Sequence, residues 1–258
     1  MQIRSSFFTA LLILPLAFCM ILLPGCATSP VAVVASPVEQ TKYDNALGIE
    51  LASQLESKLK FRKDKEVEIY LRKLAQTLTQ ASSELSAAGI GVLVVNNSKT
   101  KWSNYSLPGN RIYLSDGLLR GLDYESEIAA AIAFELGHLL KRSALARYAQ
   151  LITKPDGCFP VPIKVMGPAG IFDFSEEQNL KACDAAVEIL YKSGYDPRGM
   201  VALWLQFQKN SPRSPFEPEL LAKLMDRTRR AVSVYAPLRN PVVRSEAFLA
   251  IQKRIHNL

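Results

Sequence analysis

The sequence contains little histidine and little cysteine. Its 258 residues include two histidines, His138 and His256, and four cysteines. Glycine and proline, with 13 and 15 residues, stand near their ordinary usage, which excludes a fibrous or a disordered chain. The sequence also lacks an internal repeat and any cluster of arginines and aromatic residues typical of nucleic-acid binding. With 48% hydrophobic and 21% charged residues, a chain of this length can bury one sizeable core, and we expect one globular domain.

The N-terminal residues carry a signal for export. Arg4 precedes an apolar run over residues 7–23, and the sequence Leu-Pro-Gly-Cys follows at residues 23–26. This arrangement predicts a lipoprotein signal peptide over residues 1–25. Because the processing chemistry needs a thiol at the cleavage junction, we expect Cys26 to carry the lipid and to begin the mature chain. An uncleaved membrane anchor is the alternative.

The predicted export sets the compartment and the partners. Ala27 follows Cys26, and the usual bacterial sorting logic then favours the periplasmic side of the outer membrane. Removing residues 1–25 removes one charge, that of Arg4, so the formal net charge falls from +7 to +6. Such a charge suits an anionic membrane or acidic polypeptides, although ordinary solvated lysines explain it more simply. No nucleic-acid partner is expected.

Two cysteines remain for the folded domain. Cys19 leaves with the signal peptide and Cys26 takes the lipid, so Cys158 and Cys183 form a pair in an oxidising compartment. A disulfide between them would close a loop of about 25 residues and stabilise the fold by roughly 3 kcal/mol. Two free, buried thiols are the alternative.

Periodicity and turn residues predict a mainly helical α+β domain over residues 43–258, after a tether at 26–42. Short β-branched runs predict strands at 90–95 and 111–114. Prolines and glycines predict a loop at 155–170. Three helices are expected at 44–59, 65–83 and 124–148. A fourth begins at a capping box formed by Ser175 and Gln178 and ends just before Gly194. Further helices are expected around Trp204 and at 217–234 and 244–255.

The helix predicted at 124–148 contains the most informative segment. Residues 134–138 read Phe-Glu-Leu-Gly-His. In the motif H-E-x-x-H, two imidazoles on one helix face bind zinc, and the glutamate activates the metal-bound water. Here Phe134 stands at the first histidine, while Glu135 and His138 keep their spacing. Taken alone, a Glu-x-x-His pair on an amphipathic helix is more often structural.

Three separated stretches extend this similarity. Residues 103–119 resemble the stretch N-A-F-A-L-P-G-G-x-I-x-V-x-x-G-L-L of the HtpX and CAAX-endopeptidase family of zinc metallopeptidases. Residues 125–138 resemble the E-x-E-L-A-x-V-L-A-H-E-x-x-H motif that follows it, and residues 179–197 resemble E-x-E-A-D-x-x-x-V-x-x-L-x-x-A-G-Y-D-P. More narrowly, the chain is similar to periplasmic peptidases associated with outer-membrane protein assembly. The resemblance covers residues 43–255 and implies a zincin-like, gluzincin-type domain with a small sheet and an edge strand over the cleft.

The resemblance also implies where the third zinc ligand would stand. Counting back eleven residues from Gly194 places Cys183 at the aspartate of the family and Lys181 at the ligand glutamate. Two of the three protein ligands are then replaced, at Phe134 and Lys181. Because each lost ligand costs on the order of 3 kcal/mol of binding, we expect no bound zinc and no other cofactor.

The replaced ligands leave two hypotheses for Lys181. In the first, its ammonium takes the place of the metal as the positive partner of the buried Glu135 carboxylate. In the second, it reaches solvent and pairs with Glu177, one turn earlier on the same helix.

Three functions fit these patterns. The leading one is a lipoprotein without proteolytic activity that keeps the cleft and edge strand and binds unfolded or assembling envelope proteins by strand addition. The second is an active zinc endopeptidase, with Glu135 as general base, His138 as a ligand and Glu177 as a substitute ligand. The third is a structural lipoprotein that contacts an envelope complex through its basic face. No serine or cysteine has an evident base partner that would support another peptidase mechanism.

Overall fold

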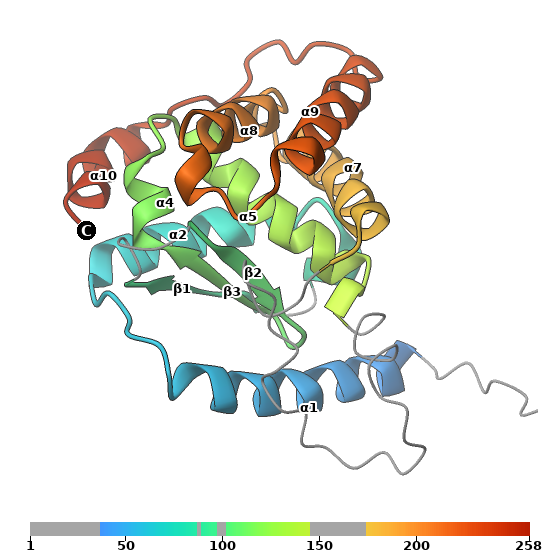
Figure 1. The fold of residues 1–258 in the computed structure, drawn as a ribbon, viewed down its shortest axis with the longest axis vertical. Helices are drawn as coiled ribbons and strands as arrows, with labels where there is room; N and C mark the ends of the chain where they lie inside the picture. The colour runs from blue at the N-terminus through green and yellow to red at the C-terminus, as the bar shows by residue number, and fades with distance from the viewer. Residues whose placement is uncertain (1–36, 87–88, 97–101, 145–173) are drawn as a thin grey trace, which may run out of the picture. The chain divides into compact units, whose positions relative to one another are not determined.

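The computed structural model describes residues 37–86, 89–96, 102–144 and 174–258 (Figure 1). This part of the chain forms nine α-helices and one three-stranded sheet, which is the mainly helical α+β class that the sequence predicts. The helices are α1 (Pro37–Glu56), α2 (Lys65–Thr79), α3 (Ser83–Ser86), α4 (Asp116–Arg120), α5 (Glu125–Leu140), α7 (Glu176–Lys192), α8 (Gly199–Lys209), α9 (Pro218–Ser233) and α10 (Glu246–His256). The strands are β1 (Gly91–Val95), β2 (Asn104–Leu107) and β3 (Arg111–Ser115).

The sheet is mixed and has the strand order β1-β3-β2. β1 runs parallel to β3, with Val92 opposite Ile112, and β2 runs antiparallel to β3, with Tyr105 opposite Tyr113. An antiparallel bridge joins Phe61 to the end of β1. β2 is therefore the strand at the other edge of this sheet.

Side chains of the sheet alternate between two hydrophobic clusters, as the period of a strand requires. Ile112 and Leu114 join the larger cluster, which α2, α5, α7 and α8 complete. Tyr113 points the other way and packs in the smaller cluster with Leu47 and Leu51 of α1. Figure 1 shows α1 crossing one face of the sheet while α2 and α5 cover the other. Residues 36–258 form one compact unit.

Helix α5 is the centre of the larger cluster, and it is buried around its whole circumference. All residues from Glu125 to His138 are buried. A Cβ atom added at Gly137 would lie 2.3 Å from the carbonyl oxygen of Ala182 on α7. Only glycine fits at this crossing, and it lets α5 and α7 approach to backbone contact.

Several boundaries differ from those that the sequence predicts. α1 begins at Pro37, inside the segment expected to be a tether, and ends at Glu56. The helix expected at 65–83 ends earlier, at Thr79, with Gln80 as its C-cap, and a separate short helix, α3, starts at Ser83. α7, α9 and α10 match the predicted helices within two residues. Residues 1–36, the predicted loop at 155–170 and the end of the helix predicted at 124–148 lie outside the described residues. No helix of the described part is long and apolar enough to span a membrane.

We expect Gly137→Ala to lower the free energy of unfolding by about 1 to 3 kcal/mol, because the added methyl group would overpack the contact between α5 and Ala182. Urea denaturation followed by circular dichroism measures the change. Gly89→Ala is the matched control, since a Cβ atom there meets nothing within 4 Å. Equal stability of the two variants would contradict the tight crossing of α5 and α7.

Candidate functional site

The residues that the sequence singles out on α5 lie beside β2 and α7. Glu135 and His138 point into the interior, and their exposed fractions are 2% and 3%. Asn104 and Ser106 of β2 contact Glu135, and Asn179 of α7 contacts His138. The structure thus brings the predicted general base and one predicted zinc ligand together, in a place sealed from solvent.

The carboxyl group of Glu135 is held by β2. The side-chain amide of Asn104 donates a hydrogen bond of 2.7 Å to Oε1, and the Ser106 hydroxyl donates one of 3.2 Å to the Glu135 backbone carbonyl. Oε2 is buried and has no hydrogen-bond partner among the described residues. Burial raises the pKa of Glu135 to about 8, because interactions with Ser106 and Asn104 only partly compensate for the lost hydration. The group is therefore largely a neutral carboxylic acid at pH 7.

The imidazole of His138 lies between two phenyl rings. The Phe174 ring stacks on it, with centroids 4.2 Å apart and an interplanar angle of 18°. Phe134 meets it edge to face at 4.7 Å. Burial lowers the pKa of His138 to about 3, and the Asn179 side chain opposes this shift only in part. The ring is neutral at physiological pH, and its Nδ1 atom has no hydrogen-bond partner in the described structure.

Phe134, at the position of the first histidine in the H-E-x-x-H pattern, takes part in an aromatic cluster. Its ring centroid lies 5.1 Å from that of Trp204 on α8 and 6.1 Å from that of Phe216, which precedes α9. Trp204 and Phe207 in turn pack edge to face against Phe216. Such contacts stabilise an interior by more than the buried area alone. The position therefore belongs to the hydrophobic core.

Lys181 does not reach the buried carboxyl group, so the predicted Lys181–Glu135 ion pair is wrong. Its ammonium lies 2.7 Å from Glu177, and the two side chains are 60% and 75% exposed. The alternative prediction, a solvent pair with Glu177, is confirmed. An ammonium group keeps its hydration there, whereas Asn104 already satisfies one oxygen of Glu135. Glu177, exposed in this pair, is also not placed to act as a substitute zinc ligand.

Asn179 is the α7 residue that faces the site, although the sequence pattern did not single it out. It is 5% exposed, and its amide donates hydrogen bonds to the carbonyls of Phe174 and Ser175, at 3.1 and 3.0 Å. Asn179 lies four residues before the buried Cys183, on the same helix face. Lys181, two residues further along, lies about 200° around the helix axis.

The motif that residues 179–197 resemble contains a pattern that could have singled out Asn179. The pattern E-x-E-A-D has two glutamates. The first corresponds to Asn179, whereas the predicted ligand position, Lys181, corresponds to the second. The assignment of Cys183 to the aspartate position needs no change. Of the two positions, residue 179 is the one that is buried beside His138, whereas Lys181 lies on the exposed face of α7.

The donor atoms at the site do not fit a zinc site of the H-E-x-x-H type. In the part of the chain that the structure describes, no three or more His, Cys, Asp or Glu side chains converge to hold a metal ion. His138 is accompanied by the Asn179 amide and the Phe134 ring, in place of a carboxylate and a second imidazole. A phenyl ring donates no lone pair, and a neutral amide is a poor substitute for a carboxylate.

Cys183 is buried behind the site and forms no disulfide with a described residue. Its Sγ atom is 2.9 Å from the Thr228 hydroxyl on α9, which also accepts a hydrogen bond of 2.8 Å from the Trp204 indole. Burial raises the pKa of the thiol to about 12. Cys158, the predicted disulfide partner, and Cys26, the predicted lipidation site, lie outside the described residues. Both assignments therefore stay predictions.

Comparison with known proteins finds a family model that matches part of the chain. Residues 62–156 match the model of Peptidase family M48. The matched segment includes the three strands, α4 and α5, and therefore Phe134, Glu135 and His138, but it ends before α7. No curated protein matches the chain.

We expect Phe134→His combined with Asn179→Glu to bind roughly one zinc ion per chain, because the pair completes a two-histidine, one-carboxylate donor set with His138. Metal analysis of the purified protein after dialysis against buffered zinc measures the content. The matched control is Phe134→His combined with Lys181→Glu, which adds the same groups but places the carboxylate on the solvent face of α7. Equal zinc contents in the two double variants would contradict residue 179 as the ligand position.

The pKa of Glu135 predicts a pH-dependent stability. A folded-state pKa of about 8, against an ordinary value of 4.5, stabilises the folded chain below about pH 4.5, and this contribution is lost as the pH rises to about 8. Glu135→Gln does not titrate. As the pH rises across this window, we expect the free energy of unfolding of the variant to increase relative to that of the wild type, by up to about 1.4 kcal/mol per pH unit.

Denaturant unfolding of both proteins from pH 4.5 to pH 8.5 tests this expectation. His138 contributes to stability with the opposite pH dependence. Because its pKa is lowered to about 3 in the folded chain, this stabilisation is present above about pH 6.5 and is lost as the pH falls. It occurs in both proteins and cancels in the difference. A difference that stays constant over the range would show that Glu135 is ionised in the folded chain.

Proposed function

We propose that this protein is a proteolytically inactive lipoprotein with a domain similar to M48 peptidases, which binds unfolded or assembling envelope proteins. In this proposal the lipid on Cys26 anchors it at the periplasmic side of the outer membrane. Its functional analogues are then the HtpX and CAAX-endopeptidase type of peptidases, in the branch associated with outer-membrane protein assembly. The observation that carries the proposal is the aromatic cluster around Phe134, which occupies the position of the first zinc ligand.

The state of Glu135 supports the loss of proteolytic activity. A metallopeptidase needs an ionised carboxylate beside a metal-bound water that a peptide can reach. Glu135 is 2% exposed, and burial favours its neutral form at pH 7. His138 is covered by Phe174. Neither group is available to water or to a substrate in this arrangement.

The geometry of β2 supports binding of an extended chain. The amide of Ser115 donates to the carbonyl of Ser103, and antiparallel ladders alternate, so the backbone groups of Asn104 and Ser106 point away from β3. They face the outer edge of the sheet. An added strand from an unfolded protein would pair with the backbone groups of Asn104, as in other cases of β-augmentation, whereas the backbone N–H of Ser106 interacts with the Glu135 carboxyl group.

One observation favours a second candidate function, an active zinc endopeptidase with atypical metal ligands. The Oε2 atom of Glu135 and the Nδ1 atom of His138 are both buried without a hydrogen-bond partner among the described residues. Buried polar atoms of this kind cost free energy unless a partner satisfies them. A rearrangement that exposed both groups would be needed before they could act on a peptide.

We expect the full chain to bind a urea-denatured outer-membrane porin on rapid dilution and to leave it uncleaved. Pull-down through a C-terminal tag, with the bound porin analysed by gel electrophoresis and mass spectrometry, measures binding and cleavage together. Asn104→Pro should weaken binding, because proline removes the outward backbone N–H of β2. Asn104→Ala is the matched control, since it removes the same side chain but keeps the N–H.

The other outcomes separate the candidates. Porin fragments that disappear in Glu135→Gln, together with stoichiometric zinc in the wild-type protein, would establish the endopeptidase. Absence of porin binding, or equal binding by both residue-104 variants, would refute the role of the β2 edge. Circular dichroism confirms that each variant is folded.

A further inference from the structure

Phe174 lies over the imidazole of His138. It stands just before the capping residue of α7, outside any helix or strand, and it is half-buried. Its ring stacks on the imidazole, with the two centroids 4.2 Å apart. It also packs at the margin of the smaller hydrophobic cluster. Because His138 is only 3% exposed, Phe174 forms an outer layer over a buried ring.

Asn179 ties this outer layer to the ring beneath it. Its side-chain amide donates one hydrogen bond to the Phe174 carbonyl, at 3.1 Å, and one to the Ser175 carbonyl, at 3.0 Å. These two bonds use both amide protons, so the interaction of Asn179 with His138 is left to its oxygen atom. One side chain on the first turns of α7 therefore contacts both Phe174 and the imidazole that it covers.

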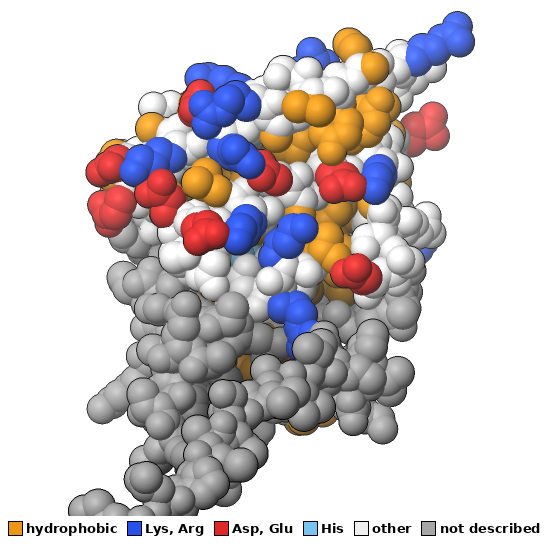
Figure 2. All heavy atoms as spheres, turned by 90° about the vertical axis from the view of Figure 1, so that its right-hand side faces the viewer, with side chains coloured by type: hydrophobic (Ala, Val, Ile, Leu, Met, Phe, Trp, Pro, Cys, Tyr) orange, Lys and Arg blue, Asp and Glu red, His pale blue; other side chains and the backbone are white. Residues whose placement is uncertain are grey.

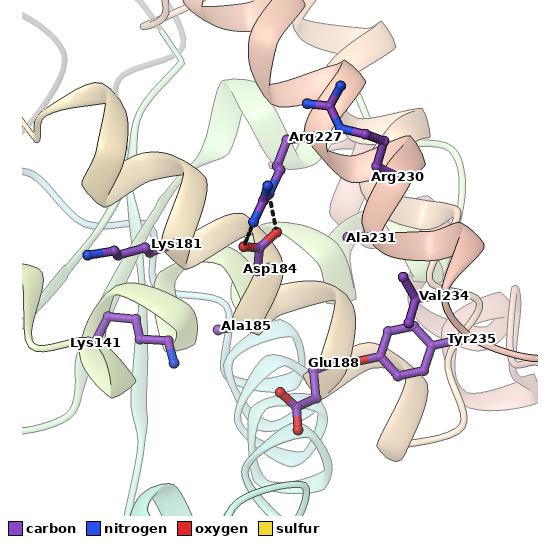
Figure 3. Close-up of a pocket in the computed structure, with 10 residues that line it drawn as sticks. All are labelled: Lys141, Lys181, Asp184, Ala185, Glu188, Arg227, Arg230, Ala231, Val234 and Tyr235. Carbon is purple, nitrogen blue, oxygen red and sulfur yellow. Dashed lines mark hydrogen bonds and ion pairs between the residues drawn. The ribbon is translucent and has the colours of Figure 1, made fainter.

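The helix that carries this amide is itself firmly packed. Ala182 and Ala186 of α7 are 0% exposed. On the outer face of the helix, Arg227 of α9 donates hydrogen bonds of 2.7 and 2.6 Å to Asp184, in the wall of a cavity of about 770 Å³ (Figure 3). Figure 2 turns to the viewer the side of the molecule on which α7 and α9 lie in Figure 1, and shows basic and acidic side chains interspersed there. A movement that uncovers the imidazole must therefore begin before the first turn of α7.

The covered arrangement leaves two polar atoms without a partner. Nδ1 of His138 and Oε2 of Glu135 are buried and form no hydrogen bond with a described residue. Each buried polar atom of this kind costs free energy, and contact with water removes that cost. Uncovering the imidazole would hydrate Nδ1, and water can replace the two hydrogen bonds that Asn179 donates. The covered and uncovered states are therefore closer in free energy than the burial of the ring alone suggests.

We infer that Phe174 is a movable cover of His138, which Asn179 holds closed and which opens while the rest of the domain stays folded. Opening gives water and small molecules access to an unpartnered ring nitrogen, and closing removes that access. Local openings of this kind need little of the free energy that global unfolding needs. The inference goes beyond the strand binding proposed for β2 and does not depend on it, because no partner protein takes part.

Modification of the full chain with diethyl pyrocarbonate at pH 7 tests this inference. The reagent reacts with neutral imidazoles. The chain has two histidines, so peptide mass spectrometry follows His138 and the half-buried His256 separately. We expect His138 to react measurably but more slowly than His256. Its rate should stay constant within about twofold as urea is raised to the start of the unfolding transition, because a local opening exposes little surface.

Loss of the Asn179 amide should speed the reaction of His138. Asn179→Ala removes both hydrogen bonds to the cover, and we expect a roughly 10- to 30-fold faster reaction at His138 with no change at His256. Asn210→Ala is the matched control, because it removes an amide hydrogen bond to a backbone carbonyl at the end of α8. Its effect on the rate at His138 should stay within about twofold.

A smaller cover tests Phe174 without removing the Asn179 amide. Phe174→Leu should speed the reaction of His138 roughly 3- to 10-fold, because it loses the ring that stacks on the imidazole. Phe216→Leu is the matched control, since the Phe216 ring packs against that of Phe134, on the other side of the site. The free energy of unfolding of each variant, measured in urea, separates local opening from a loss of global stability.

Four results would overturn the inference. The rate at His138 could rise with urea in parallel with global unfolding, or His138 could fail to react before the chain unfolds. Either result would show that Phe174 is an ordinary core residue. Equal rates at His138 and His256 in the wild type would show that Phe174 does not cover the imidazole. Effects of the site variants that equal those of their controls, or that the change in global stability accounts for, would refute the roles of Phe174 and Asn179.

Discussion

The backbone contact between α5 and α7 organises the rest of the domain. Gly137 permits it, because any larger residue would place its Cβ against the Ala182 carbonyl. The contact holds the two helices in one register, and that register decides which α7 side chains meet Glu135 and His138. Asn179 and Cys183 lie inside, and Lys181 lies outside. The same crossing fixes the outer face of α7 opposite α9, where a cavity of about 770 Å³ lies. One glycine thus sets the geometry of two surfaces with different chemistry.

The buried site lies in the segment that matches M48 peptidases, and its side chains pack as part of a core. Phe134 contributes to a network of aromatic rings, and His138 is neutral between two of them. Glu135 remains in place because Asn104 and Ser106 of β2 hold it. A single carboxyl group of this kind is tolerable in an interior when it can take up a proton.

Local sequence signals predicted much of this fold. The capping box of Ser175 and Gln178 predicted the start of α7, and the β-branched run near Val92 and Val94 predicted β1, because both depend on neighbouring residues. The burial of Glu135 and His138 was not predicted from the helix pattern, which suggested an amphipathic helix, whereas α5 is buried on every side. The similarity of this region to M48 peptidases was likewise readable from its motifs, and the family match over residues 62–156 agrees.

The partners across α5 and α7 were harder to predict. Lys181 and Asn179 are two residues apart, and a pattern with a glutamate at both positions did not distinguish them. Which of the two residues faces the site depends on the rotation of α7 about its axis. The contact of Ala182 with Gly137 on α5 sets that rotation, and the sequence of α7 alone does not show it. The early start of α1 at Pro37 was missed because the residues before Asp44 lack a helical apolar period, and the structure nevertheless extends the helix through them.

The aromatic cluster couples positions 134 and 179 across the interface. A histidine at 134 alone would place an unpaired polar ring among Trp204 and Phe216. A glutamate at 179 alone would place a charge beside a neutral His138. Each single change is unfavourable, and only their combination offers each new group a partner through the metal. Exchange between the packed site and a metal-binding site by single substitutions therefore passes through a less stable variant in either direction. The residues at 134 and 179 each make the other harder to replace.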